Sequence, residues 1–138
     1  MKRSLIALIA LFVLSGFVPA IADSADLPTS IREVFRQALP DRPGTDVTVI
    51  TVDYAPGEST PPHEHPGETY AYVLKGAVVS QLDDEPPHTF TEGQMWSETP
   101  HQRHMVSRNA SATEPARLLV FFIAPHGEKL TTMLPAKP

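Results

Sequence analysis

From residue 45 onward, apolar and polar residues alternate along the chain in short segments that end at glycine, proline or acidic residues. An alternation with a period of two is typical of β-strands, because successive side chains of a strand point to opposite faces. The segments with this pattern are 45–54, 69–75, 77–82, 88–91, 94–98, 104–108 and 117–124. Together with the extended segment near residue 63 they make about eight strands with closely spaced turns, which predicts an all-β sandwich or barrel.

Residues 30–39 have a different period. Ser30 can cap a helix and Glu33 can complete a capping box. The apolar residues recur at the helical spacings i, i+3, i+4, i+7 and i+8, and Pro40 then ends the pattern. We therefore expect one short N-terminal helix that packs on the barrel. A lid or a partner-binding element is the alternative role for this helix.

The N-terminal residues have the features of an export signal. Lys2 and Arg3 precede an apolar run over 5–18, and residues 20–22 read Ala-Ile-Ala, the small-residue pattern of a cleavage site. We expect cleavage after Ala22 and a periplasmic or secreted protein without a membrane segment after cleavage; uncleaved anchoring is the alternative. The expected organisation is a signal peptide over 1–22, a leader and short helix over 23–44, the barrel over 45–126 and a C-terminal tail over 127–138.

Composition narrows the classes of chemistry. The chain has no cysteine, which excludes disulfides, thiolate metal sites and thiol nucleophiles. Its formal net charge is −5, and removal of the signal would make it more negative, so nucleic acid is not an expected partner. Fifteen prolines argue against long helices.

Two histidines stand two residues apart in a segment that prolines keep extended. Pro61 and Pro62 disfavour a helix, so His63 and His65 should share one face of a strand while Glu64 points away. Two imidazoles on one face can bind the same metal ion, but such a site usually has three or four ligands. A third candidate, His104, opens a later strand segment.

At these residues the sequence resembles the cupins. The pattern PG-x5-HEH-PG-x4-YVLKG, over 56–76, is similar to the first cupin motif, and G-x10-H-x4-N, over 93–109, is similar to the second. The resemblance implies a small antiparallel jelly-roll β-barrel that holds one divalent metal through two histidines and a glutamate of the first motif and a histidine of the second. It makes His63, His65 and His104 the expected ligands.

The expected glutamate is displaced in this chain. The family usually has it four residues after the second histidine, where this chain has Thr69, and Glu68 stands one residue early. A one-residue offset turns a side chain to the opposite face of a regular strand, although a bulge could bring Glu68 back to the metal. Three histidines with water in the open positions is the preferred site, with Glu68 as the candidate fourth ligand. Such a site suits Fe, Mn, Ni, Cu or Zn.

Other residues have open roles. His101, where the second motif usually has glycine, could be a ligand, a proton shuttle or an exposed residue, and we expect no site role for His88 and His126. Both faces of the 69–75 strand are apolar, because Tyr70, Tyr72 and Leu74 alternate with Thr69, Ala71 and Val73. This suggests burial on both sides, in part by a second subunit of a homodimer.

Two functions follow as hypotheses. The resemblance implies a metal-dependent enzyme, dioxygenase-like or related, that acts on a small organic molecule, with the bound ion doing the chemistry. The alternative is a non-catalytic module that binds a metal or a small ligand, which the displaced glutamate favours. A structural barrel that has lost its metal is a third reading.

Overall fold

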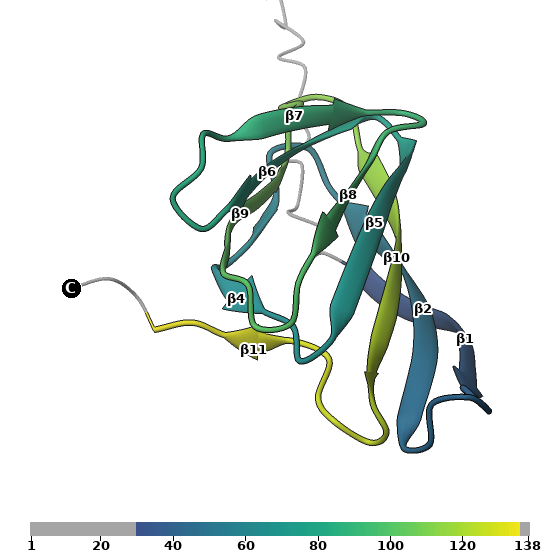
Figure 1. Cartoon of the computed structure of the whole chain (residues 1–138). Coiled ribbons are helices and arrows are strands. Elements are labelled where there is room, and N and C mark those ends of the chain that lie inside the picture. The colour runs from purple at the N-terminus through teal and green to yellow at the C-terminus, as the bar shows by residue number, and fades with distance from the viewer. Residues whose placement is uncertain (1–29, 136–138) are drawn as a thin grey trace, which may run out of the picture.

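Two antiparallel sheets make up the computed structural model, which describes residues 30–135 (Figure 1). Within this range the chain forms strands and no helix, so the predicted all-β antiparallel class is confirmed. The strands are β1 (Ser30–Ala38), β2 (Thr45–Tyr54), β3 (Ser59–Thr60), β4 (His63–Glu64), β5 (Glu68–Lys75), β6 (Ala77–Leu82), β7 (His88–Thr91), β8 (Met95–Glu98), β9 (His104–Asn109), β10 (Ala116–Pro125) and β11 (Thr132–Met133).

The two sheets face each other but do not close into the predicted barrel. One sheet has the order β1-β2-β10-β5-β8, and the other has the order β11-β4-β9-β6-β7 with β3 paired to β9. No ladder among the described strands joins the two sheets. The edge strands, β1 and β8 of one sheet and β11 and β7 of the other, each pair only with a strand of their own sheet. The chain passes from one sheet to the other between β5 and β6 at Gly76, whose φ of 72° is accessible to glycine at little cost. The architecture is therefore a jelly-roll-like sandwich.

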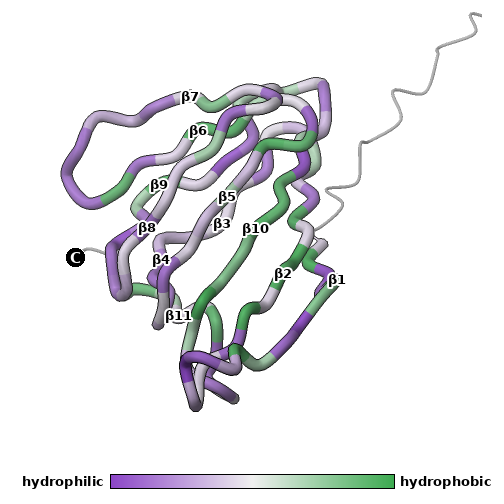
Figure 2. Tube along the Cα trace, turned by 45° about the vertical axis from the view of Figure 1, so that its right-hand side comes forward, coloured by the Kyte–Doolittle hydropathy of each residue, from purple (hydrophilic) through white to green (hydrophobic). Residues whose placement is uncertain are grey.

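The core lies between the sheets and depends on the alternation of the central strands. In β10, residues 116, 118, 120, 122 and 124 are all buried and face the other sheet. The residues between them are also largely apolar, and Figure 2 shows β10 and β2 as the most hydrophobic part of the trace. The core cluster comprises Val52, Tyr54, Ala71, Val73, Val78, Trp96, Ala116, Leu118, Val120 and Phe122.

The outer face of the five-stranded sheet stays apolar and accessible. Ala71 and Val73 of β5 are buried, whereas Tyr72, Leu74 and Phe121 are exposed on the opposite side. The expectation that both faces of this strand are apolar is thus confirmed. The homodimer inferred from it stays a prediction.

The predicted N-terminal helix is wrong, because residues 30–38 form strand β1. This strand pairs antiparallel with β2 and has a register shift between Glu33 and Phe35. A bulge of this kind inserts an extra residue into one strand, so Ile31 and Phe35 lie on opposite faces although they are four residues apart. The spacing of apolar residues that suggested one face of a helix therefore arises from an edge strand whose bulge shifts the alternation by one residue.

Part of the predicted C-terminal tail belongs to the fold. Strand β11, in the segment expected to be a tail, pairs with β4 at the margin of the six-stranded sheet. The predicted signal peptide, by contrast, lies outside the described residues. Residues 30–135 contain no helix of the length and hydrophobicity that a membrane crossing requires.

Candidate metal centre

His63 and His65 point into the space between the sheets, as the two-residue spacing predicts. Both are buried, with exposed fractions of 5% and 6%, whereas Glu64 between them is partly exposed. Gly67 allows the segment to pass this close to β10, since a Cβ at this position would lie 2.7 Å from the Cα of Ala124. The sequence therefore folds the HEH segment tightly against the core.

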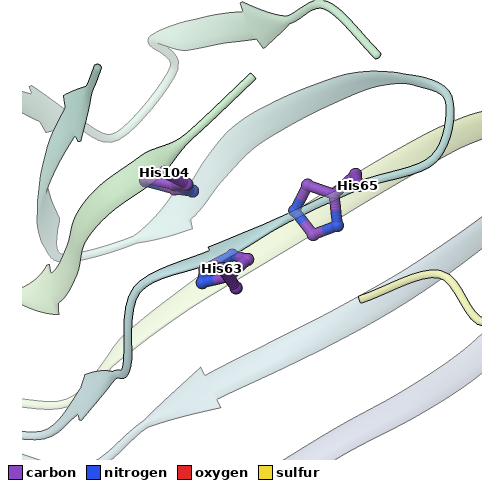
Figure 3. A group of neighbouring side chains, drawn as sticks. All are labelled: His63, His65 and His104. Atoms are coloured by element: carbon purple, nitrogen blue, oxygen red, sulfur yellow. The ribbon is translucent and has the colours of Figure 1, made fainter. Parts of the chain in front are cut away.

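His104 joins them from the next strand of the same sheet. It pairs in register with His63 across the β4–β9 ladder, and the two ring centroids lie 4.8 Å apart. The rings of His63 and His65 lie 4.9 Å apart. Figure 3 shows the three rings gathered in one place, and their ligand nitrogens all lie within 4.8 Å of one another. These three histidines could hold a metal ion.

A hydrogen bond fixes the orientation of each ring. Nδ1 of His63 lies 2.8 Å from the carbonyl of Pro61, and Nδ1 of His65 lies 2.6 Å from the carbonyl of Leu130. A carbonyl only accepts, so both rings carry their proton on Nδ1 and keep the lone pair of Nε2 for a metal. Nε2 of His104 contacts the hydroxyl of Ser80 at 2.9 Å, which leaves its Nδ1 for the same use.

The structure adds a residue that the sequence analysis missed. Glu98, at the end of β8, is 4% exposed, and its carboxylate reaches two of the three rings. Oε1 accepts a hydrogen bond from Nε1 of Trp96 at 2.9 Å and lies 3.2 Å from Nδ1 of His104. Oε2 lies 3.7 Å from Nε2 of His65. The alternation of β8 contained the signal, because Glu98 shares a face with the apolar Trp96.

The donor atoms present fit a cation. Among the described residues, the buried side-chain atoms without a hydrogen-bond partner are Oε2 of Glu98 and Nδ1 of His104. Buried polar atoms are rarely left unpaired, because the loss of their hydration costs free energy. Nδ1 of His104 belongs to the histidine cluster, and Oε2 of Glu98 lies 3.7 Å from Nε2 of His65. Both atoms are of types that bind transition metals. A metal ion between them would satisfy both.

The pKa values of His63, His65 and Glu98 favour the protonation states that bind a metal. Burial lowers the pKa of His63 to about 4 and also lowers the pKa of His65, so both imidazoles are neutral at pH 7. Burial alone would raise the pKa of Glu98, but contacts with His104, His65 and Trp96 outweigh it and hold that pKa below its usual value. The site thus presents the neutral imidazoles of His63 and His65 and one ionised carboxylate.

Acid should destabilise the metal-free protein between pH 6.5 and 4. His63 takes up a proton near pH 6.5 when unfolded but only near pH 4 when folded, so the unfolded state binds more protons in this window. Its contribution to stability is complete above pH 6.5 and falls by about 3 kcal/mol as the pH approaches 4. Urea unfolding of chelator-treated protein at several pH values measures this loss. A His63→Gln variant should show a smaller loss, and an equal loss in both proteins would contradict the assignment to His63.

Glu68 does not take part in this cluster. Its side chain is 45% exposed and lies 4.0 Å from Arg42, whereas the neighbouring Thr69 is buried. The strand is regular here, so the one-residue offset turns Glu68 to the outer face. The suggested fourth ligand is therefore not brought to the site. His88 and His126 are exposed and also lie outside the cluster, as expected.

His101 is exposed, and its ring does not enter the site. Its side chain is 66% exposed, and its Nδ1 lies 3.2 Å from a carboxylate oxygen of Glu64. Its φ of 60° is in the left-handed region, which explains why glycine is the usual residue at this turn. Of the roles considered for His101, the structure supports the exposed one.

Replacing His101 with glycine should stabilise the protein. Relief of the left-handed strain is expected to raise the free energy of unfolding by about 1 kcal/mol, because an exposed contact such as that with Glu64 contributes little. Urea unfolding measures the change, and the metal content should stay the same. A lower stability would show that the Glu64 contact outweighs the strain.

A cavity of about 180 Å³ opens beside the cluster. Its wall is mostly apolar, and its polar lining residues include the three histidines, Glu98, Thr60, Ser107, Lys129 and Thr131. The lining residues include Ile50, Val52, Tyr54, Ala71, Trp96, Leu118, Val120, Phe122 and, at the C-terminal segment, Lys129, Thr131 and Met133. Such a cavity suits a small molecule with an apolar body and one polar end at the cluster.

Comparisons with known proteins agree with this architecture. The family model for the cupin domain matches residues 50–122. No match is found among the curated proteins.

Solved structures give the same fold. A cupin family protein from Methanocaldococcus jannaschii with a double-stranded β-helix fold has a TM-score of 0.58 and 16% identity, over 89% of this chain and 94% of its own. The protein TT1209 from Thermus thermophilus has a TM-score of 0.56 and 26% identity, over 71% and 84%. The DMSP lyase DddQ from Ruegeria pomeroyi has a TM-score of 0.55 and 21% identity, over 63% of this chain, but the match spans only 42% of the lyase.

Proposed function

We propose that this chain, which belongs to the cupin family, is an exported protein that binds one divalent transition metal and catalyses a reaction of a small organic molecule. One observation carries the proposal: three buried histidines present their ligand nitrogens within 4.8 Å of one another. Burying three imidazoles costs free energy, because each ring loses its hydration, and binding a shared metal ion would offset this cost. A lyase among the proteins of the same fold supports catalysis on a small molecule.

Three residues would bind the metal ion, and two backbone carbonyls would orient two of them. His63, His65 and His104 would hold the ion, and the carbonyls of Pro61 and Leu130 would keep the first two rings in the tautomer that binds it. A bound ion would supply Lewis-acid or redox chemistry at the substrate. Imidazole ligands are compatible with Fe, Mn, Ni, Cu or Zn.

The cavity wall defines the kind of substrate. Most side chains beyond the cluster are apolar, with Val52, Leu118 and Val120 among them. Lys129 adds one cationic side chain to the wall. An apolar wall favours a molecule that buries a carbon skeleton and directs one polar group toward the metal end.

Elemental analysis tests the proposal. The protein should be expressed with its own N-terminal segment and purified without a histidine tag. About one equivalent of a transition metal per chain is expected. Metal below about a tenth of an equivalent, in protein that also fails to take up added Fe²⁺, Mn²⁺, Ni²⁺, Cu²⁺ or Zn²⁺, would overturn it.

A non-catalytic binding module is the second candidate. It is favoured by the scarcity of acidic groups, since Glu98 is the only carboxylate among the described residues that line the cavity. Oxygen consumption and product formation with catechols, flavonols and small dicarboxylates separate the two candidates. Turnover of a catechol or flavonol would support the enzyme, and tight metal retention without any turnover would support the module.

A further inference from the structure

We propose that Glu98 is the fourth protein ligand, so that the carboxylate of the metal centre comes from β8. This inference rests on the proposed function, because it assigns a residue to the same site. It goes further by naming a ligand that no sequence motif indicated.

The position of Glu98 relative to the rings is that of a ligand. Its two oxygens lie 3.2 Å from Nδ1 of His104 and 3.7 Å from Nε2 of His65. These two nitrogens are the ones that the hydrogen bonds to Ser80 and Leu130 leave available. The carboxylate therefore faces the same space as the lone pairs of the imidazoles.

The contacts of Glu98 are incomplete without a cation. Nε2 of His65 is an acceptor, because the proton of that ring is on Nδ1, and Oε2 of Glu98 opposite it is also an acceptor. Two facing acceptors repel unless a positive charge lies between them. Oε2 has no hydrogen-bond partner, and Trp96 donates only to Oε1. A metal ion would turn this unfavourable contact into two coordination bonds.

The strand register explains how the carboxylate arrives. Glu98 pairs with Thr69 across the β5–β8 ladder, so its side chain projects from the same face of the sheet as Thr69. The hydroxyl of Thr69 donates to the carbonyl of Gly67, which leaves this part of the site without a ligand from β5. Two chain segments would then each supply two ligands, His63 with His65 and Glu98 with His104.

Titration with Co²⁺ tests the assignment, since this ion reports its coordination through visible absorption. The variants are Glu98→Gln, which keeps the shape of the side chain and removes its charge, and Glu68→Gln as the matched control on the outer face. Glu98→Gln should weaken Co²⁺ binding by at least about tenfold and change the visible spectrum. Glu68→Gln should bind within about twofold of the wild type, with an unchanged spectrum.

Several outcomes decide the matter. Wild-type affinity in Glu98→Gln would overturn the assignment. Weaker binding with an unchanged visible spectrum would also overturn it, because that result indicates a residue that only positions the histidines. If Glu98→Gln does not fold, the wild type remains decisive: its infrared carboxylate bands should shift when Co²⁺ is added, and unshifted bands would overturn the proposal. Failure of the wild type to bind any metal would instead contradict the proposed function itself.

Discussion

Replacing both His63 and His65 with alanine should abolish metal binding. The double variant is expected to retain less than about a tenth of an equivalent of metal, because a single histidine with one carboxylate does not make a stable transition-metal site. Both rings are buried and both keep Nε2 free, so their loss removes two of the converging ligand atoms. Elemental analysis of parallel preparations measures the effect.

The control for this experiment is His88→Ala. His88 is exposed in β7 and lies outside the cluster, so this variant should contain as much metal as the wild type. Circular dichroism should show that the double variant is folded. Equal metal content in the double variant and in His88→Ala would contradict a metal centre at His63 and His65.

Replacing Phe122 with alanine should destabilise the protein by about 3–5 kcal/mol. Phe122 is 2% exposed and belongs to the core cluster between the sheets. Its truncation removes a large apolar side chain from close packing and leaves a cavity that the two sheets cannot readily fill. Its ring also packs against that of His65, at a centroid distance of 5.0 Å. Urea unfolding of metal-free protein measures the loss.

The adjacent residue provides the control. Phe121 lies on the outer face of the same strand and is 36% exposed, so Phe121→Ala should cost only about 1 kcal/mol in the monomer. The comparison separates burial from the change of residue type. Similar losses in the two variants would mean that the outer face is covered in solution, which the predicted homodimer would explain.

The strands and the histidine cluster could be predicted because their signals are local. The alternation over 45–54 and 117–124 gave the bounds of β2 and β10 to within one residue. The HxH spacing placed His63 and His65 on one face, and the resemblance to cupins brought His104 to them. Each of these inferences requires only short-range geometry or a known motif.

The failures concern features that depend on strand pairing. In residues 30–38 the bulge shifts the alternation of apolar residues. No local feature of the sequence distinguishes a bulged edge strand from a helix with one apolar face. For the carboxylate, the offset at Glu68 was recognised, but the carboxylate that lies beside the histidines, that of Glu98, is thirty positions further along the chain. Only the register between β5 and β8 brings Glu98 opposite Thr69. Closure into a barrel likewise depends on which marginal strands meet, and the alternation of single strands does not determine this.

The carbonyl of Leu130 means that the position at which a shortened chain ends can affect the metal centre. It holds Nδ1 of His65, although it lies eight positions beyond the last residue matched by the family model. A chain shortened to the recognisable domain would keep every histidine of the centre and most of its core. It would nevertheless release one imidazole to rotate and exchange tautomers, so loss of metal in a truncated chain would not by itself show that the full-length protein lacks a metal.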